Sequence, residues 1–162
     1  MANTLSVRRA AADDLSAVAA LYHDAVGRSG CTWNEQYPTL EDAAADLEAG
    51  GLYVFCRGGE VIGALSVVSE NELDGLPFWT SAEKPHEIAR VVIDRRMAGH
   101  GYAAVLVSSV LTILREEGCD AVHLLVSPGN PAAIRTYEKL GFRPAHSVFL
   151  YDNDFCAMEK RL

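Results

Sequence analysis

Hydrophobic residues recur along the chain with two spacings, and the two spacings predict a mixture of strands and helices. Residues 4–10 (TLSVRRA) alternate between apolar and polar side chains, as a strand with one buried face does. Residues 11–27 carry apolar side chains three and four positions apart, which is helical spacing, and Gly27 is the predicted end. Residues 39–50 repeat the helical pattern in a shorter segment that ends at two glycines.

The middle of the chain predicts three strands. Residues 52–70 (LYVFCRGGEVIGALSVVSE) read as two β-rich runs joined by a Gly-Gly turn, which is a strong hairpin signal. Residues 71–85 are polar and rich in turn formers, so we expect a loop there. Residues 86–93 (HEIARVVI) form the next predicted strand.

The last third predicts a strand between two helices and then a hairpin. Residues 102–118 carry a clean apolar stripe at helical spacing. Residues 121–126 (AVHLLV) are almost continuously apolar, which is typical of a strand buried on both faces in a parallel pair. Residues 130–141 predict a short helix capped by its asparagine, and residues 142–162 a hairpin that turns at YDND.

Together these elements predict an α/β fold with the order β-α-α-β-β-β-α-β-α-β-β. We expect a mixed central sheet flanked by helices, antiparallel at first, with one βαβ crossover and a closing hairpin. No linker or internal repeat is visible, so residues 1–162 are predicted to form one domain.

Composition narrows the classes of function. The net charge is −8, from 22 acidic and 14 basic residues, which argues against a nucleic-acid-binding protein. No segment has the apolar length of a membrane helix, and the N-terminus lacks a signal-like apolar core, so we expect a cytoplasmic protein without membrane contact. The five histidines and four cysteines are scattered, so we expect no metal site.

The segment RRMAGHGYAA, residues 95–104, carries the clearest chemical signal. Glycines 99 and 101 lie between a predicted strand and a long helix, beside two arginines, as in a phosphate-binding helix N-terminus. The segment GHGYAA also matches a relaxed dinucleotide fingerprint, but a lone match is weak and the loop comes too late in the chain. A glycine turn that only shortens the loop is the third interpretation.

Two motifs resemble the GCN5-related N-acetyltransferase (GNAT) superfamily. RMAGHG fits its Arg/Gln-x-x-Gly-x-Gly/Ala signature, and NPAAIRTYEKLGF, residues 130–142, fits a second and more specific motif. The element order is similar as well, and the resemblance covers nearly the whole chain. It implies a GNAT-like fold and acetyl-CoA, or another acyl-CoA, as the donor.

The resemblance also implies which residues hold the donor. Backbone amides of residues 97–102 would wrap the CoA pyrophosphate, and the strand before them would offer backbone groups to the pantetheine arm. The amide of Val92 would polarise the thioester carbonyl. Charge from Arg95 and Arg96 would add to the loop, and a Cβ at either glycine would collide with the phosphate. The full donor set is Val91, Val92, Ile93, Arg96, Met97, Ala98, Gly99, His100, Gly101, Tyr102, Asn130 and Ala133.

Acyl transfer to an amine needs a base and an acid. An alkyl ammonium has a pKa of about 10.4, so a group must remove its proton before attack. Glu87 is the candidate base, on the face that alternation shares with Ala89 and Val91, and His86 is the runner-up. Tyr137 is the candidate acid, since the family places a tyrosine near the CoA sulfur and a phenol can donate a proton to it.

The acceptor pocket is predicted from two loops. Trp33, Tyr37, Glu70 and Trp79 are the candidate substrate-binding residues, because aromatic rings near acids suit an ammonium group. Other aromatic and acidic side chains of these loops are further candidates: Phe78, Glu35 and Glu72. The competing interpretation is that the aromatics anchor loops and the acids are solvated.

The predicted function is therefore acyl-CoA-dependent transfer of an acetyl group to an amine of a small molecule or peptide, by direct attack in a ternary complex. The alternatives are a CoA-binding sensor without turnover and a dinucleotide-dependent oxidoreductase. A homodimer is a further expectation, because the hairpin and edge strands need covering.

Overall fold

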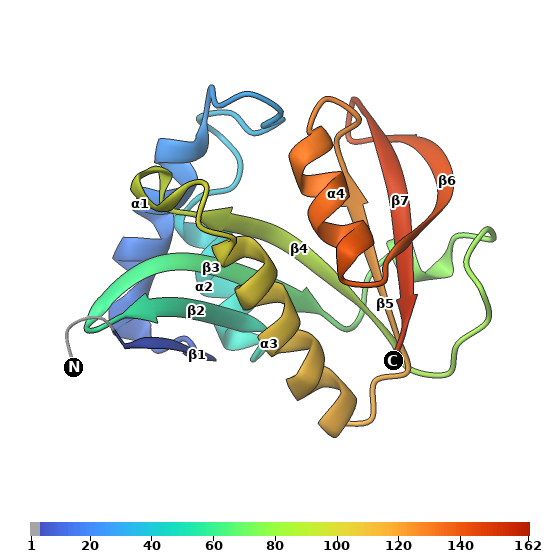
Figure 1. Ribbon diagram of the computed structural model, residues 1–162, viewed down its shortest axis with the longest axis horizontal. Helices are drawn as coiled ribbons and strands as arrows, with labels where there is room; N and C mark the ends of the chain where they lie inside the picture. The colour runs from blue at the N-terminus through green and yellow to red at the C-terminus, as the bar shows by residue number, and fades with distance from the viewer. Residues whose placement is uncertain (1–3) are drawn as a thin grey trace.

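Seven strands of the chain form one mixed sheet, with the spatial order β1-β2-β3-β4-β5-β7-β6 (Figure 1). The computed structural model describes residues 4–162. The strands are β1 (Leu5–Arg9), β2 (Leu52–Arg57), β3 (Glu60–Val68), β4 (Pro85–Ile93), β5 (Ala121–Val126), β6 (Arg143–Leu150) and β7 (Asn153–Arg161). The helices are α1 (Leu15–Ala25), α2 (Leu40–Glu48), α3 (Tyr102–Glu116) and α4 (Pro131–Lys139). This confirms the predicted order of elements.

Three short 3-10 turns supplement these elements. They are η1 (Ala12–Asp14), η2 (Leu73–Gly75) and η3 (Arg95–Met97). The first lies inside the predicted 11–27 helix as a separate turn before α1, and the second lies inside the predicted loop 71–85. The third lies inside the arginine and glycine segment, between β4 and α3.

The helices cover the two faces of the sheet (Figure 1). Alternate residues of β2 divide between two buried clusters, because successive side chains of a strand point to opposite faces. Tyr53 and Phe55 join the cluster made with α3 and α4. Val54 and Cys56 join the cluster made with α1 and α2. Both faces are therefore core, which explains why β2 reads as a nearly unbroken apolar run.

Strands β4 and β5 are parallel neighbours that separate. They pair only at Pro85–Ala121, His86–Val122 and Glu87–His123, and beyond these three pairs no register is kept. β3 holds the other edge of β4, and β7 pairs antiparallel with the whole of β5. The two strands therefore diverge toward their C-terminal ends and leave a gap in the sheet, here called the strand gap. The predicted parallel pairing of residues 121–126 is correct only at the start of β5.

A β-bulge interrupts β4. Ala64 of β3 faces Val92, but Ser66 faces Ala89, so β4 has one more residue than β3 between these pairs. Arg90 lies in the bulge with a φ of 52°, which is uncommon for a residue other than glycine. The bulge inverts the side-chain alternation, and Val91 packs against the α3 face. The prediction that Glu87 and Val91 share a face is therefore wrong, because alternation across the whole strand required an unbroken ladder.

The closing hairpin turns at the predicted YDND segment. Tyr151 and Asp152 have φ values of 53° and 62°, which is the pattern of a type I′ turn between two antiparallel strands. This turn brings β6 to the edge of the sheet beside β7. Over residues 4–162, no helix is long and apolar enough to cross a membrane.

Candidate active site

A cavity of about 450 Å³ occupies the strand gap. Its walls come from the end of α1 and the loop after it, from the separated parts of β4 and β5, and from α4. Side chains from both faces of the sheet line it, so the cavity passes through the sheet where the two strands have parted. Of the predicted site residues it contains Trp33, Val91, Val92, Ile93, Asn130, Ala133 and Tyr137.

The backbone of β4 offers free hydrogen-bonding groups to the cavity. The Asp94 amide donates to the Ile62 carbonyl at 2.8 Å, which fixes the phase of the ladder with β3. In an antiparallel ladder alternate residues bond to the same neighbour, so the Val92 amide also points to β3. The amides of Val91 and Ile93 then face the gap. The Val92 amide was expected to polarise the thioester carbonyl, but it points to β3. The amides of Val91 and Ile93 are therefore the candidates for that role.

The glycine segment forms the entry to α3. Gly99 and Gly101 have φ values of 81° and 74°, and Gly101 is the residue directly before the helix begins. No atom lies within 4 Å of a Cβ built at either position, so the glycines are required by their backbone angles rather than by crowding. Met97 is buried and anchors the segment to the core. The first amides of α3 have no partner within the helix, as at any helix N-terminus.

Both arginines of this segment are engaged elsewhere. The Arg96 guanidinium lies 2.7 Å from an Asp94 carboxylate oxygen and 3.1 Å from one of Glu60. Arg95 donates to the Asp24 carbonyl at 2.7 Å. Both guanidinium groups therefore have partners on the protein, and their contribution of positive charge to a phosphate stays a prediction. The backbone amides and the helix dipole remain.

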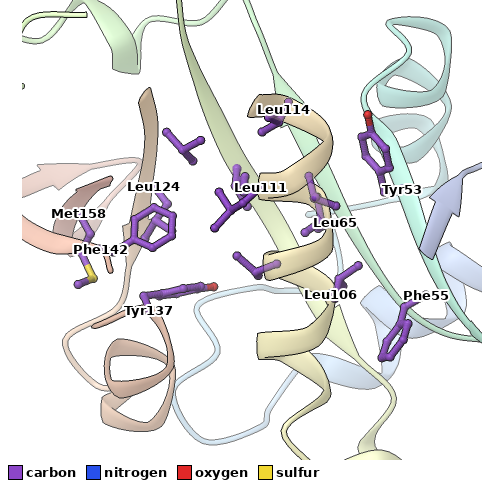
Figure 2. Packing of buried hydrophobic residues seen from close by; sticks show 14 of the residues in the cluster. Tyr53, Phe55, Leu65, Leu106, Leu111, Leu114, Leu124, Tyr137, Phe142 and Met158 are labelled. Carbon is purple, nitrogen blue, oxygen red and sulfur yellow. The ribbon is translucent and has the colours of Figure 1, made fainter. Parts of the chain in front are cut away.

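Tyr137 reaches the cavity from α4. Its ring packs edge-on against Phe142, with centroids 5.8 Å apart, and its hydroxyl end is directed toward α3 (Figure 2). Burial raises the pKa of Tyr137 to about 12, so the phenol keeps its proton at neutral pH. Asn130 caps α4 as predicted, accepting from the Ala133 amide at 3.2 Å. The cap fixes the first turn of the helix that carries the tyrosine.

Glu87 lies where β4 and β5 begin to separate. It is half-buried, and burial is the main reason why its pKa is raised to about 7. The charge of Arg90 opposes this rise, while the carboxylates of Asp74 and Asp46 add to it. The side chain does not line the cavity itself. It is a carboxylate that exchanges a proton near neutral pH, as a general base requires.

Arg90 and Asp46 form a bidentate ion pair beside Glu87. Two guanidinium nitrogens lie 2.9 Å from the two carboxylate oxygens, and both side chains are nearly buried. Asp46 also accepts from the Ser66 hydroxyl at 2.6 Å, and Arg90 donates to the Tyr37 hydroxyl at 2.9 Å. The pair therefore ties α2 and the loop before it to the bulge of β4.

A second buried pair lies on the other side of Glu87. Nδ1 of His123 is 2.6 Å from an Asp74 carboxylate oxygen, while its buried Nε2 has no hydrogen-bond partner among residues 4–162. The ring of Trp79 stacks on His123 with centroids 3.9 Å apart, and its Nε1 donates to the Leu73 carbonyl. Trp79 does not line the cavity, and its ring and its Nε1 both help to anchor the 71–85 loop, so its place in the acceptor pocket stays a prediction.

The remaining acceptor candidates are spread out. Trp33 is half-buried and packs edge-on against Tyr22 at 5.5 Å, whereas Tyr37 is 43% exposed and reaches the site only through Arg90. Glu70 is exposed and lies outside the cavity. The other three are placed elsewhere: Phe78 stacks on His146, Glu35 lies 3.4 Å from His23, and Glu72 is exposed near the hairpin tip.

The structure adds residues that the sequence did not single out. Arg28 and Arg90 line the cavity, and Tyr151 lies near Glu87, whose charge helps to raise the pKa of that phenol after burial. Only Arg90 had a signal, as a charged residue inside an apolar strand. His86, the runner-up base, has its Nδ1 2.7 Å from the Pro85 carbonyl and is absent from the cavity. Within residues 4–162, no group of three histidine, cysteine or acidic side chains could hold a metal ion.

Comparison with known proteins matches the chain to the acetyltransferase (GNAT) family over residues 18–142. An L-methionine sulfoximine/L-methionine sulfone acetyltransferase of Pseudomonas aeruginosa is 30% identical over 143 residues, covering 85% of this chain and 79% of that protein. The ribosomal-protein-alanine N-acetyltransferase of Brucella melitensis is 26% identical, with a TM-score of 0.78 over 97% of this chain and 99% of that one.

A GNAT superfamily phosphinothricin acetyltransferase from Sinorhizobium meliloti, solved with acetyl-CoA, has the same fold. It is 21% identical, with a TM-score of 0.77 over 100% of this chain and 89% of that one. The dinucleotide alternative is excluded by the same topology, because the sheet has one parallel pair where a doubly wound sheet has several.

Proposed function

Because this chain belongs to the acetyltransferase (GNAT) family, we propose that it moves the acetyl group of acetyl-CoA to the primary amine of an amino-acid-like small molecule. The chain is an acyl-CoA-dependent N-acetyltransferase with acetyl-CoA as its co-substrate. The acceptor, the residue roles and the action of residues 1–162 as one domain are the parts proposed. The observation that carries the proposal is the half-buried Glu87 at the start of the strand gap, with Tyr137 across the cavity.

The donor site is proposed at the strand gap and the glycine segment. Bound acetyl-CoA would supply the thioester whose acetyl group is transferred. The amides of Val91 and Ile93 face the gap and can donate to the pantetheine arm and the thioester carbonyl. The open amides of Gly99, Gly101 and the first turn of α3 fit a pyrophosphate, since a helix N-terminus favours anions.

Glu87 is proposed as the general base. An ammonium with a pKa of about 10.4 is almost wholly protonated at neutral pH, so its proton must leave before attack. A carboxylate with a pKa of about 7 is a far better base than one near 4.5, yet is still mostly ionised just above neutrality. Because Glu87 lies beside the cavity rather than in its wall, the proton would pass through a bridging water.

Tyr137 is proposed to donate to the departing sulfur. Its raised pKa keeps the hydroxyl protonated throughout the neutral range, so a donor is always present. A charge-assisted hydrogen bond from this hydroxyl would stabilise the thiolate as the bond to carbon breaks. The rigid cap of α4 and the packing on Phe142 hold the ring in place, which lowers the cost of orienting it.

The acceptor class is proposed from the relatives and the site. The 30% identical relative acetylates amino-acid derivatives, and the Brucella neighbour acetylates a protein alanine. We favour the small acceptor because Trp33 and Arg90 line the cavity and the 30% identical relative is named for amino-acid derivatives. Net acidity around Glu87 favours an amine that arrives as a cation.

Thiol release from acetyl-CoA tests the proposal. Purified protein would be assayed with L-methionine sulfoximine, L-methionine sulfone, several free amino acids and an alanine-starting peptide. Turnover with an amino-acid-like acceptor at a kcat/KM at least tenfold above the peptide supports the proposal. A preference for the peptide overturns the acceptor class, and protein that acetyl-CoA does not stabilise against heat overturns the donor site.

The assembly and the compartment are also proposed. β1 and β6 are the two edges of the sheet, and Phe149 of β6 is 66% exposed. An uncovered edge with an exposed aromatic favours a homodimer that covers it. The mass of the protein in solution tests this, and cell fractionation tests the cytoplasmic location.

A further inference from the structure

Two basic side chains line the cavity, Arg28 and Arg90. Arg90 is neutralised by its bidentate pair with Asp46. Arg28 differs, since no carboxylate of residues 4–162 lies within ion-pair distance of it. A half-buried cation without a counter-ion, in a cavity of an acidic protein, is an anion-binding candidate.

The backbone of Arg28 is fixed by the turn that ends α1. Its amide donates to the Ala25 carbonyl at 3.1 Å, and its carbonyl accepts from the Cys31 amide at 3.0 Å. The side chain crosses to β4, where Nη1 donates to the Ile93 carbonyl at 2.9 Å. Ile93 is the last residue of β4, and its backbone faces the strand gap. The guanidinium therefore lies inside the gap, on a rigid base.

The position of Arg28 also borders the glycine segment. Asp94 follows Ile93 and begins that segment, and its carboxyl pKa is lowered chiefly by hydrogen bonds from Arg96. The charge of Arg28 contributes to the same lowering, so Arg28 lies near Asp94 as well. Arg28 is thus close to both the gap and the segment, while Arg96 and Arg95 are held by other groups.

We propose that Arg28 is the phosphate-binding cation of the donor site, which exchanges the Ile93 carbonyl for a phosphate of CoA. The inference rests on the proposed donor site. A phosphate is an anion that can accept two parallel hydrogen bonds from a guanidinium, whereas the Ile93 carbonyl is neutral and accepts one, so the exchange is favourable. It releases the Ile93 carbonyl, which can then accept from an amide of the pantetheine arm. One residue therefore couples recognition of the phosphate to the release of a backbone acceptor in the gap.

Calorimetric titration of Arg28→Gln with CoA, dephospho-CoA and pantetheine tests the proposal. We expect the Kd for CoA to rise at least tenfold, because a charge-assisted contact is lost. Pantetheine, which has no phosphate, should bind the variant as tightly as it binds the wild type. It could bind the variant more tightly, because without Arg28 the Ile93 carbonyl is free to accept from it. If dephospho-CoA shows the same loss as CoA, the contact is to the pyrophosphate. If its loss is much smaller, the contact is to the 3′-phosphate.

Arg115→Gln is the matched control. Arg115 is exposed in the last turn of α3, away from the cavity, so this variant removes the same charge without touching the site. Its Kd for CoA should equal that of the wild type. Arg28→Lys keeps the charge but not the forked geometry, and should recover part of the affinity.

The outcomes separate this inference from the proposed function. Equal CoA affinity in the wild type and Arg28→Gln overturns the role of Arg28 and leaves the donor site intact. Equal loss with CoA and pantetheine also overturns it, since the side chain would then support the gap rather than bind phosphate. Wild-type protein that binds neither CoA nor acetyl-CoA overturns the donor site itself.

Discussion

Glu87 of β4 and His123 of β5 face each other in the last pair of the short parallel ladder. One residue further along, the strands separate and the cavity begins at Ile88. The candidate base is therefore held by the paired part of the sheet, while the proposed donor site lies in the unpaired part. Backbone hydrogen bonds on both sides of Glu87 limit its movement, which favours a constant distance to a bound acceptor.

Glu87→Gln should lower kcat by about 10²–10⁴-fold, the range of a lost general base. In the wild type, kcat/KM should rise tenfold per pH unit below about pH 7 and level off above it, because only the ionised carboxylate accepts the proton. In the variant, this rise of kcat/KM below pH 7 should be absent. Rates measured from pH 5.5 to 9 check both the lower kcat and the lost pH dependence. If the variant keeps the wild-type pH dependence, another group is the base.

The same substitution should stabilise the fold above neutral pH. The pKa of Glu87 is higher in the folded protein than its ordinary value of about 4.5, so ionisation costs folding free energy. This cost is absent below pH 4.5, grows as the pH rises to about 7, and is complete above it. Tm measured at pH 5 and pH 8 should show an advantage for Glu87→Gln that is larger at pH 8. A larger advantage at pH 5 contradicts the raised pKa.

Tyr137→Phe should lower kcat by about tenfold or more with little change in the KM for acetyl-CoA. The phenylalanine retains the packing against Phe142 and loses only the hydroxyl, so the fold should be kept (Figure 2). Because the pKa of Tyr137 is about 12, the wild-type rate should show no decline from this group up to pH 10. Steady-state kinetics checks that kcat falls while the KM for acetyl-CoA does not change. An unchanged kcat means that another group donates the proton.

Gly101→Asp should weaken CoA binding by at least a hundredfold, because it adds a negative charge where the pyrophosphate is expected and strains a φ of 74°. Gly118→Asp is the control. Gly118 follows the other end of α3 with a φ of 91°, and a Cβ there also meets open space. Both variants should lose stability, the second more because its new charge opposes the dipole of α3, but only the first should lose affinity in a calorimetric titration. Equal affinities in the two variants remove the segment from the donor site.

Trp33→Ala and Trp79→Ala should separate binding from folding. Trp33 lines the cavity, so its loss should raise the KM of the acceptor severalfold. Trp79 stacks on His123 and anchors a loop, so its loss should cost about 2 kcal/mol of folding free energy, below the value for a fully buried aromatic. Kinetics and denaturant unfolding of both variants check this. A raised acceptor KM in Trp79→Ala with unchanged stability contradicts the assignment.

The local elements were predictable because their signals are local. The apolar spacing of 102–118, the Asn-Pro start of 130–141 and the Gly-Gly turn after Arg57 each act within a few residues, and all three recur in the structure. The glycine segment before α3 was predictable for the same reason. Glycines with positive φ at the start of a helix leave a mark in the sequence that a short window captures.

The bulge, the strand gap and the state of each arginine depended on contacts distant in sequence. The bulge arises from the register of β4 against β3, and the gap arises because β3 and β7 hold β4 and β5 apart. Arg96 is neutralised by Glu60 of another strand, whereas Arg28 reaches Ile93 across the cavity. Spacing along the chain determined the elements and the glycine segment of this protein. Tertiary structure decided which charges remain free and which amides face the strand gap, because pairing partners and burial exist only once distant segments meet.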